Sequence, residues 1–173
     1  RGIDETMVNL YKHMDNVQHK ELTGVTTGFN TLDRITGGLQ PGGMYIVAAR
    51  PSVGKSAFMG KMVYNAAKKG LTVGVISLEM TDNQITARIS SLATEIEYWR
   101  IYRSRLVDEE QAERFYRLTA EVSELPILIS DKTGVDISEI KAKISRIKRK
   151  AKIDVLYIDY LQLLDTDDRE RSY

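Results

Sequence analysis

The chain has 173 residues, with 25 Lys+Arg against 24 Asp+Glu, and therefore a formal net charge of +1. This length is typical of one domain with a substantial core, and the near-neutral charge neither favours nor excludes a polyanionic partner. The sequence has no cysteine, no membrane-spanning apolar run and no signal peptide, which argues against disulfide or thiol chemistry and leads us to expect a cytoplasmic protein. Because the chain opens with Arg1 rather than methionine, we expect it to be part of a longer protein.

The first eighteen residues predict an amphipathic helix, because apolar side chains recur there at helical spacing. A short helix is marginal alone, so its apolar stripe is expected to pack either on its own domain or on a neighbouring subunit. A glycine-punctuated stretch from Gly24 to Gly43 follows, in which Phe29, Leu32 and Ile35 predict a second short helix. The apolar positions of the first helix are Met7, Leu10, Tyr11, Met14 and Val17.

From residue 44 onward, predicted strands and helices alternate along the chain. Such alternation gives right-handed crossovers and an α/β fold with a mainly parallel sheet and helices on both faces. Gly70 is expected to end the first of these helices, and a capping box of Thr81 and Gln84 to begin the second. The predicted strands are 44–48, 71–78, 127–130 and 153–158, and the predicted helices are 56–69, 81–92, 95–125 with a break near 107–108, and 136–150 with Asp136 as its cap.

Between the first predicted strand and its helix, Ala49 to Ser56 read Ala-Arg-Pro-Ser-Val-Gly-Lys-Ser. In a phosphate-binding loop, backbone N–H groups cradle phosphate, a lysine such as Lys55 reaches the β- and γ-phosphates, and a hydroxyl such as that of Ser56 ligates magnesium. Ala49 replaces the usual first glycine, which is tolerable because a residue at the end of an extended strand needs no positive φ. The alternative is an ordinary turn with a serine that caps the helix. The residues predicted to bind a nucleoside triphosphate are Arg50, Pro51, Ser52, Val53, Gly54, Lys55, Ser56 and Ala57.

Two acidic residues follow other predicted strands, Glu79 after the second strand and Asp159 after the fourth. Ligands of parallel sheets bind beyond the carboxyl ends of the strands, so we expect both acids on the same rim. Asp159 fits the acid that holds magnesium through its water shell, and Glu79 fits the group that positions or deprotonates the attacking water. The alternative for Glu79 is a carboxylate favoured by the dipole of the following helix. We predict Lys55 and Glu79 as catalytic residues and Ser56 and Asp159 as metal ligands.

Five segments of the sequence, taken together, resemble the successive motifs of the RecA-like ATPase domain of DnaB-type replicative DNA helicases. The resemblance covers nearly the whole chain from about Thr23 onward, and alanine before Arg-Pro-Ser is the usual form in that family. It implies a RecA-like P-loop NTPase fold preceded by an N-terminal linker helix. The segments are Gly28–Asp33, Gly37–Gly42, Ala48–Ser56, Ser77–Met80 and Ile158–Leu163.

This resemblance implies an ATP-hydrolysing helicase of DNA replication that uses ATP and Mg²⁺. It would assemble as a homohexameric ring with ATP at the subunit boundaries and translocate on single-stranded DNA, with primase and a helicase loader as further partners. Residues 1–22 would be a linker helix docking on a neighbouring subunit, and residues 23–173 the ATPase domain. Family members continue with a strand ending in a glutamine sensor, DNA-contacting loops and an arginine finger. We expect this C-terminal part to be absent here, and its strand to lie between the phosphate-loop strand and the Asp159 strand.

Two other functions share the phosphate loop, and both stay open at this point. One is a RecA-like recombinase or clock-type ATPase, against which the Arg-Pro-Ser and Asp-Tyr-Leu-Gln segments argue. The other is a nucleotide-binding loader or adaptor with little hydrolysis, from which Glu79 would distinguish an active motor.

Basic side chains crowd the predicted helix 136–150, whose isoleucine spacing marks a core-facing stripe. The cations are interpreted as a solvated outer face, with a DNA contact as the alternative. Arginines interleaved with aromatic residues over 98–117 fit either base stacking or a helical subunit contact. We instead predict DNA binding at Arg169 and Arg171, which by resemblance lie in a loop facing the ring channel, with repulsion by the acidic residues around them as the alternative. The crowded cations are Lys141, Lys143, Arg146, Lys148, Arg149, Lys150 and Lys152.

Overall fold

The computed structural model describes residues 2–17, 22–105, 108–131 and 137–159. It divides the chain into two compact units, residues 1–46 and 47–173. The predicted boundary after residue 22 falls inside the first unit and stays a prediction. Within the described ranges, no helix combines the length and the apolar character that crossing a membrane requires.

The first unit contains the two helices predicted from its apolar spacing, α1 (Ile3–Val17) and α2 (Asn30–Thr36). The apolar stripe of α1 is exposed, with 60% of Tyr11 and 55% of Met14 accessible to solvent. Gly37 ends α2 with a φ of 71°, a left-handed conformation that glycine adopts without strain. An antiparallel bridge between Val25 and Leu39 joins the two ends of the loop that contains α2.

The buried carboxylate of Asp33 organises the loop that precedes α2. Its Oδ1 accepts hydrogen bonds from the Thr27 backbone N–H at 2.8 Å and the Thr27 hydroxyl at 2.6 Å, and its Oδ2 accepts one from the Thr26 hydroxyl at 2.6 Å. Burial raises the pKa of Asp33, but hydrogen bonds from Thr26, Thr27 and Gly28 together lower it further, so that the pKa lies below its ordinary value. Ionised Asp33 therefore stabilises the folded state of this unit.

Replacing Asp33 with asparagine should lower the free energy of unfolding by about 1 to 3 kcal/mol at neutral pH, because charge-assisted hydrogen bonds are lost. Since the folded pKa is depressed, this stabilisation is present above the unfolded pKa of about 3.9 and is lost as the pH falls through the folded value. Urea unfolding at neutral and acidic pH measures the difference. Asp15→Asn, at an exposed position of α1, is the control. An equal loss in both variants, or a loss that persists in acid, contradicts this prediction.

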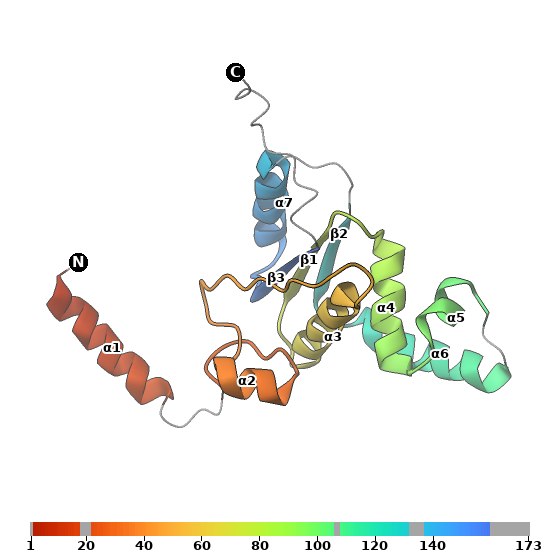
Figure 1. Cartoon of the computed structure of the whole chain (residues 1–173), viewed down its shortest axis with the longest axis horizontal. Helices are drawn as coiled ribbons and strands as arrows, with labels where there is room; N and C mark the ends of the chain where they lie inside the picture. The colour runs from red at the N-terminus through yellow and green to blue at the C-terminus, as the bar shows by residue number, and fades with distance from the viewer. Residues whose placement is uncertain (1, 18–21, 106–107, 132–136, 160–173) are drawn as a thin grey trace, which may run out of the picture. The chain divides into compact units, whose positions relative to one another are not determined.

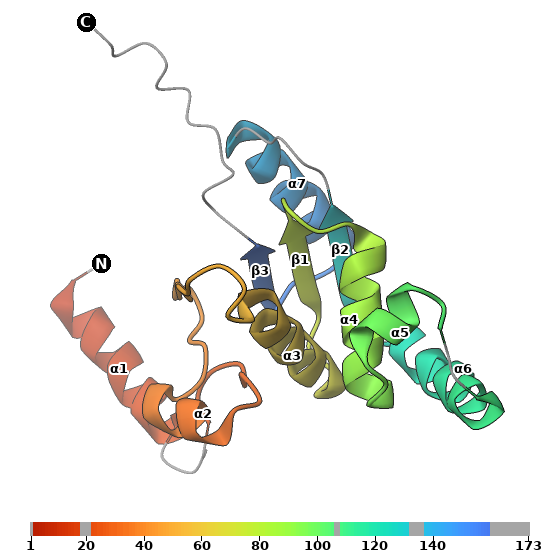
Figure 2. The same cartoon turned by 45° about the vertical axis from the view of Figure 1, so that its right-hand side comes forward.

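Among the residues that the structure describes, three parallel strands form a sheet at the centre of the second unit, in the order β2-β1-β3 (Figures 1 and 2). The strands are β1 (Val73–Ser77), β2 (Ile127–Asp131) and β3 (Val155–Asp159). The register aligns Ser77 with Asp131 on one side and with Asp159 on the other. The predicted parallel sheet is thus confirmed, and the carboxyl ends of all three strands meet at one edge.

Helices cover both faces of this sheet, as the alternation predicted (Figure 2). On one face, Ile76 and Leu78 belong to a buried cluster with Ile140 and Ile147 of α7 (Ile137–Lys150). Side chains of a strand alternate between faces, so Ser77 and Asp159 point to the opposite face. There α3 (Lys55–Lys68) buries one side of its surface. Its buried residues are Gly60, Met62, Val63, Ala66 and Ala67.

Local signals in the sequence set the ends of several helices. After α3, Gly70 has a φ of 79°, and its N–H donates to the carbonyl of Ala67 at 2.8 Å. Both halves of the Thr81–Gln84 capping box are present at the start of α4 (Asp82–Thr94). The segment 95–125 contains α5 (Tyr98–Tyr102) and α6 (Glu109–Ser123), and the Asp108 side chain caps α6 by accepting from the Gln111 N–H at 2.7 Å. Asp136, the predicted cap of α7, lies outside the described residues.

The prediction of a strand at 44–48 is wrong for this structure. These residues have no regular secondary structure, and 77% of Met44 and 71% of Ile46 are exposed. A strand requires a neighbour with which its backbone can pair, and none of β1, β2 and β3 pairs with these residues. No other strand in the described parts of the chain pairs with residues 44–48. Apolar composition alone was therefore insufficient to make this segment a strand.

Candidate nucleotide and metal site

Asp159, the last residue of β3, lies against the N-terminus of α3. Its Oδ2 accepts a hydrogen bond from the Ser56 hydroxyl at 2.7 Å, and its Oδ1 lies 3.8 Å from Nζ of Lys55. Only 2% of Asp159 is exposed, whereas the side chain of Lys55 keeps 28% of its surface accessible. The fold thus joins Lys55 and Ser56 to Asp159, a predicted site residue that follows Ser56 by 103 positions in the chain.

The oxygen atoms of Ser56 and Asp159 suit a magnesium ion, which prefers hard oxygen ligands and retains several waters. A hydroxyl and a carboxylate already within hydrogen-bond distance can bind one ion directly or through its water shell. Lys55 adds a positive charge beside them, which is the complement that a phosphate group needs. The donor set therefore fits both Mg²⁺ and a phosphate chain.

The loop before α3 has two residues in the left-handed region, Ser52 with a φ of 64° and Gly54 with a φ of 102°. A side chain added at Gly54 would meet no atom within 4 Å, so the backbone conformation and not the available space makes glycine suitable there. Loops of this kind turn successive N–H groups to one side and form a concave site for anions. The N-terminus of the 14-residue α3 contributes further free N–H groups and its dipole.

Ala49, which stands in place of the usual first glycine of the loop, is not among the residues with positive φ. Alanine is therefore tolerated there for the expected reason, because the position is not left-handed. The other predicted loop residues surround Gly54 in sequence and are exposed, apart from Lys55 and Ser56, which are partly buried. The left-handed conformation of Ser52 could not be predicted from the sequence, because glycine, and not serine, is the residue that indicates a positive φ.

Glu79 lies two residues beyond Ser77, whose Cα partner across the sheet is Asp159. Glu79 is exposed, and it forms no hydrogen bond or ion pair with any residue that the structure describes. Glu79 thus follows the edge of the sheet at which Asp159 lies, and its side chain is accessible to solvent. The position agrees with the water-activating role predicted for Glu79, which stays a prediction.

Ser77 is a candidate positioning residue that the sequence interpretation missed. Its hydroxyl accepts a hydrogen bond from the Met80 backbone N–H at 2.8 Å, which fixes the turn that carries Glu79. The Ser77 side chain is itself buried. A serine at a strand end followed by a short turn was the available signal, since serine hydroxyls commonly bond to backbone N–H groups nearby.

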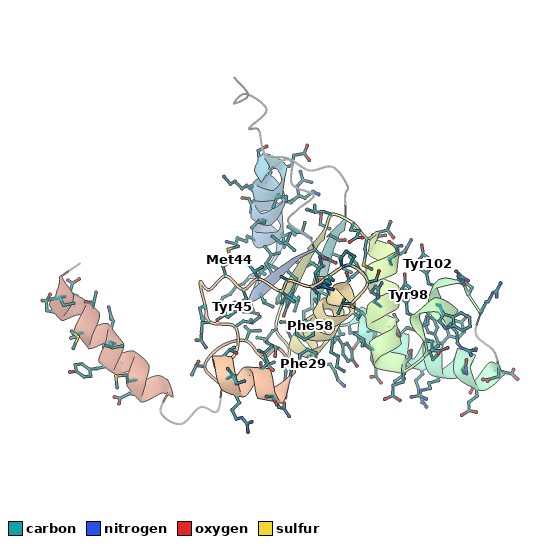
Figure 3. All side chains as sticks on the ribbon, viewed as in Figure 1. Phe29, Met44, Tyr45, Phe58, Tyr98 and Tyr102 are labelled. Atoms are coloured by element: carbon teal, nitrogen blue, oxygen red, sulfur yellow. The ribbon has the colours of Figure 1, made fainter. Side chains whose placement is uncertain are left out.

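Arginine and aromatic side chains near α5, interpreted from the sequence as a base-stacking or subunit-contact surface, interact with one another. Tyr98 and Tyr102 stack with their ring centroids 5.6 Å apart (Figure 3), and the Arg88 guanidinium lies 4.6 Å from the Tyr98 centroid. Arg100 lies similarly over Trp99, at 4.7 Å. Trp99 and Tyr102 nevertheless remain partly exposed. These contacts therefore do not distinguish base stacking from a subunit contact.

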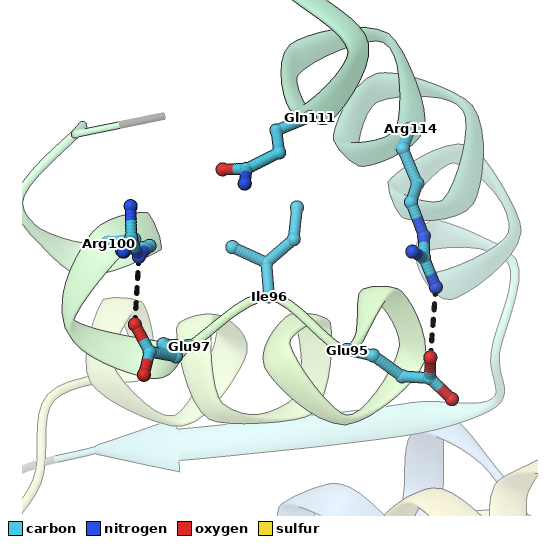
Figure 4. A pocket seen from close by; sticks show the side chains of 6 residues that line it. All are labelled: Glu95, Ile96, Glu97, Arg100, Gln111 and Arg114. Atoms are coloured by element: carbon cyan, nitrogen blue, oxygen red, sulfur yellow. Dashed lines mark hydrogen bonds and ion pairs between the residues drawn. The ribbon is translucent and has the colours of Figure 1, made fainter. Parts of the chain in front are cut away.

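A pocket of about 300 Å³ lies between the end of α4, α5 and α6 (Figure 4). Two ion pairs line it, Arg100 with Glu97 at 2.8 Å and Arg114 with Glu95 at 3.0 Å. None of the predicted nucleotide or metal residues borders this pocket, and its charges are already paired. The cluster of Lys55, Ser56 and Asp159 therefore remains the candidate site, and the pocket does not.

Arg169 and Arg171, the predicted DNA contacts, lie outside the described residues.

Comparison with known proteins gives a consistent result. Residues 24–173 match the protein family described as "DnaB-like helicase C terminal domain". The replicative DNA helicase DnaC of Bacillus subtilis and the replicative DNA helicase DnaB of Geobacillus stearothermophilus are each 33% identical to the chain over 99% of its length. The chain spans only 38% of the length of these two curated relatives.

Solved structures agree with the sequence comparisons. An ATPase domain of known structure superposes with a TM-score of 0.83 at 32% identity, covering 99% of this chain and 61% of that one. A DnaB-like replicative helicase, whose structure was solved to describe its interactions with primase, has the same TM-score at 33% identity and covers 99% of this chain and 42% of that one. The predicted RecA-like α/β fold is thereby confirmed. The alternative functions, a recombinase or clock-type ATPase and a nucleotide-binding adaptor, are not favoured by these comparisons.

Proposed function

Since this chain belongs to the family of DnaB-like helicase C-terminal domains, we propose that it is the ATP-hydrolysing motor of a replicative DNA helicase. In this proposal the protein forms a homohexameric ring in the cytoplasm, translocates on single-stranded DNA and separates the duplex. The observation that supports the proposal is the contact of Asp159 with Ser56 and Lys55, because it brings the predicted phosphate-binding loop and the predicted metal ligand together at one sheet edge.

In the proposed site, the loop from Arg50 to Ala57 binds the phosphate chain of ATP. Its backbone N–H groups surround the phosphates, and Lys55 neutralises charge on the β- and γ-phosphates. Ser56 and Asp159 hold Mg²⁺, which when bound offsets the negative charge that develops on the phosphate oxygens. Glu79 orients the attacking water and accepts its proton.

Residues 1–22 are proposed as a linker that docks on the adjacent subunit through the exposed apolar stripe of α1. The stripe is open to solvent, and a helix of 15 residues is marginal in water without packing against a neighbour. Primase is a further proposed partner, because one similar replicative helicase is described together with its interactions with primase. A helicase loader and DNA contacts at Arg169 and Arg171 belong to the same proposal.

The proposal is tested on the full-length protein with a forked DNA substrate. We expect six-membered assemblies in sedimentation, and strand separation that requires hydrolysable ATP. Met7→Glu combined with Tyr11→Glu should abolish both, because two carboxylates cannot be buried against an apolar neighbour. Asn9→Glu combined with Lys12→Glu is the matched control on the polar side of α1 and should assemble normally. A monomeric protein contradicts the ring, and ATP-independent or absent strand separation contradicts the motor.

A further inference from the structure

Helix α7 concentrates the positive charge of an otherwise acidic chain. It contains six of the 25 Lys+Arg residues and one of the 24 Asp+Glu residues, so its net charge is +5 while the rest of the chain has a net charge of −4. The overall charge of +1 conceals this separation. A strongly basic helix on a near-neutral protein is an electrostatic feature that attracts anions locally.

Four of the cations of α7 are exposed to solvent. Ile140 and Ile147 are buried against the sheet, and Ile144 packs beside them, so the exposed cations lie on other sides of the helix. In the described part of the chain, no acidic side chain forms a salt bridge with the exposed cations. The buried Nζ of Lys143 likewise finds no hydrogen-bond acceptor there. The exposed cations are Lys141, Arg146, Lys148 and Arg149.

This basic surface is separate from the candidate nucleotide site. Helix α7 packs on the sheet face that carries Ile76, whereas Asp159 contacts Ser56 of α3 on the opposite face. An anion bound by α7 is therefore not the phosphate chain of ATP. The solvent side of α7 contains no aromatic residue, so it offers charge without a platform on which bases could stack.

We propose that the solvent face of α7 is a second DNA-binding surface, which holds the phosphate backbone of single-stranded DNA without reading its sequence. The proposal rests on the proposed function in one respect, because strand separation is what supplies a single strand close to the motor. Charge complementarity supports it, since unpaired cations on one helix match a chain of phosphates. Contacts with α7 would increase the affinity of the protein for single-stranded DNA and keep the DNA bound. ATP hydrolysis would be unaffected, because the proposed nucleotide site lies on the other face of the sheet.

The test uses the full-length protein, a fluorescent oligothymidylate and a titration of salt. Lys141→Gln, Arg146→Gln and Arg149→Gln are combined in one variant, which retains good helix formers while removing three charges. The control variant combines Arg34→Gln, Lys68→Gln and Lys69→Gln, which removes three exposed charges elsewhere. We expect the slope of log affinity against log salt to flatten by about 2 in the α7 variant, because each phosphate contact on a single strand contributes about 0.7 to the slope. At low salt, we expect the affinity of this variant for the oligothymidylate to fall by about tenfold or more. The control should bind like the unmodified protein.

Three results would overturn this inference. An unchanged salt slope in the α7 variant would mean that the replaced cations contact no phosphate. Equal losses of DNA affinity in both variants would mean that binding depends only on the net charge of the protein. Polyglutamate that competes as well as oligothymidylate would identify an acidic protein as the partner. Hydrolysis of ATP without DNA is measured in parallel and should be normal in the α7 variant. Absence of strand separation in the unmodified protein would contradict the proposed motor function and not the α7 surface. Failure of the proposed function can therefore be distinguished from failure of this inference.

Discussion

Replacing Glu79 with glutamine should lower the rate of ATP hydrolysis by about 10² to 10⁴-fold while leaving the affinity for ATP close to that of the unmodified protein. Glutamine has nearly the same shape and can still contact water, but it cannot accept the proton of the attacking water. Glu79 is exposed at the edge of the sheet and pairs with no described residue, so its neutralisation should disturb the fold little. Steady-state hydrolysis and binding of a fluorescent ATP analogue measure the two quantities separately.

Asp82→Asn is the matched control for Glu79, because Asp82 is an acid in the first turn of α4. If Glu79 merely interacts with the dipole of α4, both variants should lose about 0.3 to 1 kcal/mol of stability and neither should lose activity. Unchanged turnover in Glu79→Gln would exclude the catalytic role and would favour a nucleotide-binding adaptor.

Replacing Lys55 with alanine should weaken ATP binding by about tenfold to a hundredfold, because hydrogen bonds to charged groups contribute about 1.5 to 3 kcal/mol. Hydrolysis should fall at least as far, since the charge on the γ-phosphate is then less neutralised in the transition state. Calorimetric titration with a non-hydrolysable ATP analogue and magnesium gives the binding constant directly.

Two controls make the Lys55 result specific. Lys68→Ala removes an exposed lysine from the last turn of the same helix and should bind the analogue normally. A melting temperature is also needed, because the buried Asp159 loses its nearby cation in Lys55→Ala. Normal analogue binding by a folded Lys55→Ala variant would contradict the assignment of the phosphate loop.

Most elements could be predicted because their signals are local. The capping box at Thr81 and the glycine after α3 each act within a few residues, and the isoleucine spacing of α7 directly shows which side is buried. The strand at 44–48 could not be predicted correctly in the same way. Apolar residues create a strand only when another strand supplies hydrogen-bond partners, and that is a property of the assembled sheet.

The candidate site illustrates the same division. The loop sequence indicated phosphate binding, and the acids at strand ends indicated a metal and a water-activating group, from residue type and spacing. The left-handed conformation of Ser52 had no sequence signal, and the support that the Ser77 hydroxyl gives to the Glu79 turn had only a general one, a serine at a strand end. Both depend on backbone conformation, which residue type alone leaves open.

The sequence by itself indicated which chemistry to expect, because the signals of phosphate-binding loops, strand-end carboxylates and helix caps lie within short runs of residues. Only the tertiary structure decided that the Asp159 carboxylate lies 2.7 Å from the hydroxyl of Ser56, 103 residues away, and that α7 packs on the face of the sheet opposite that site. The physical reason is that strand order and register arise from pairing and packing between distant segments, whereas helix ends and turns arise from interactions between neighbours.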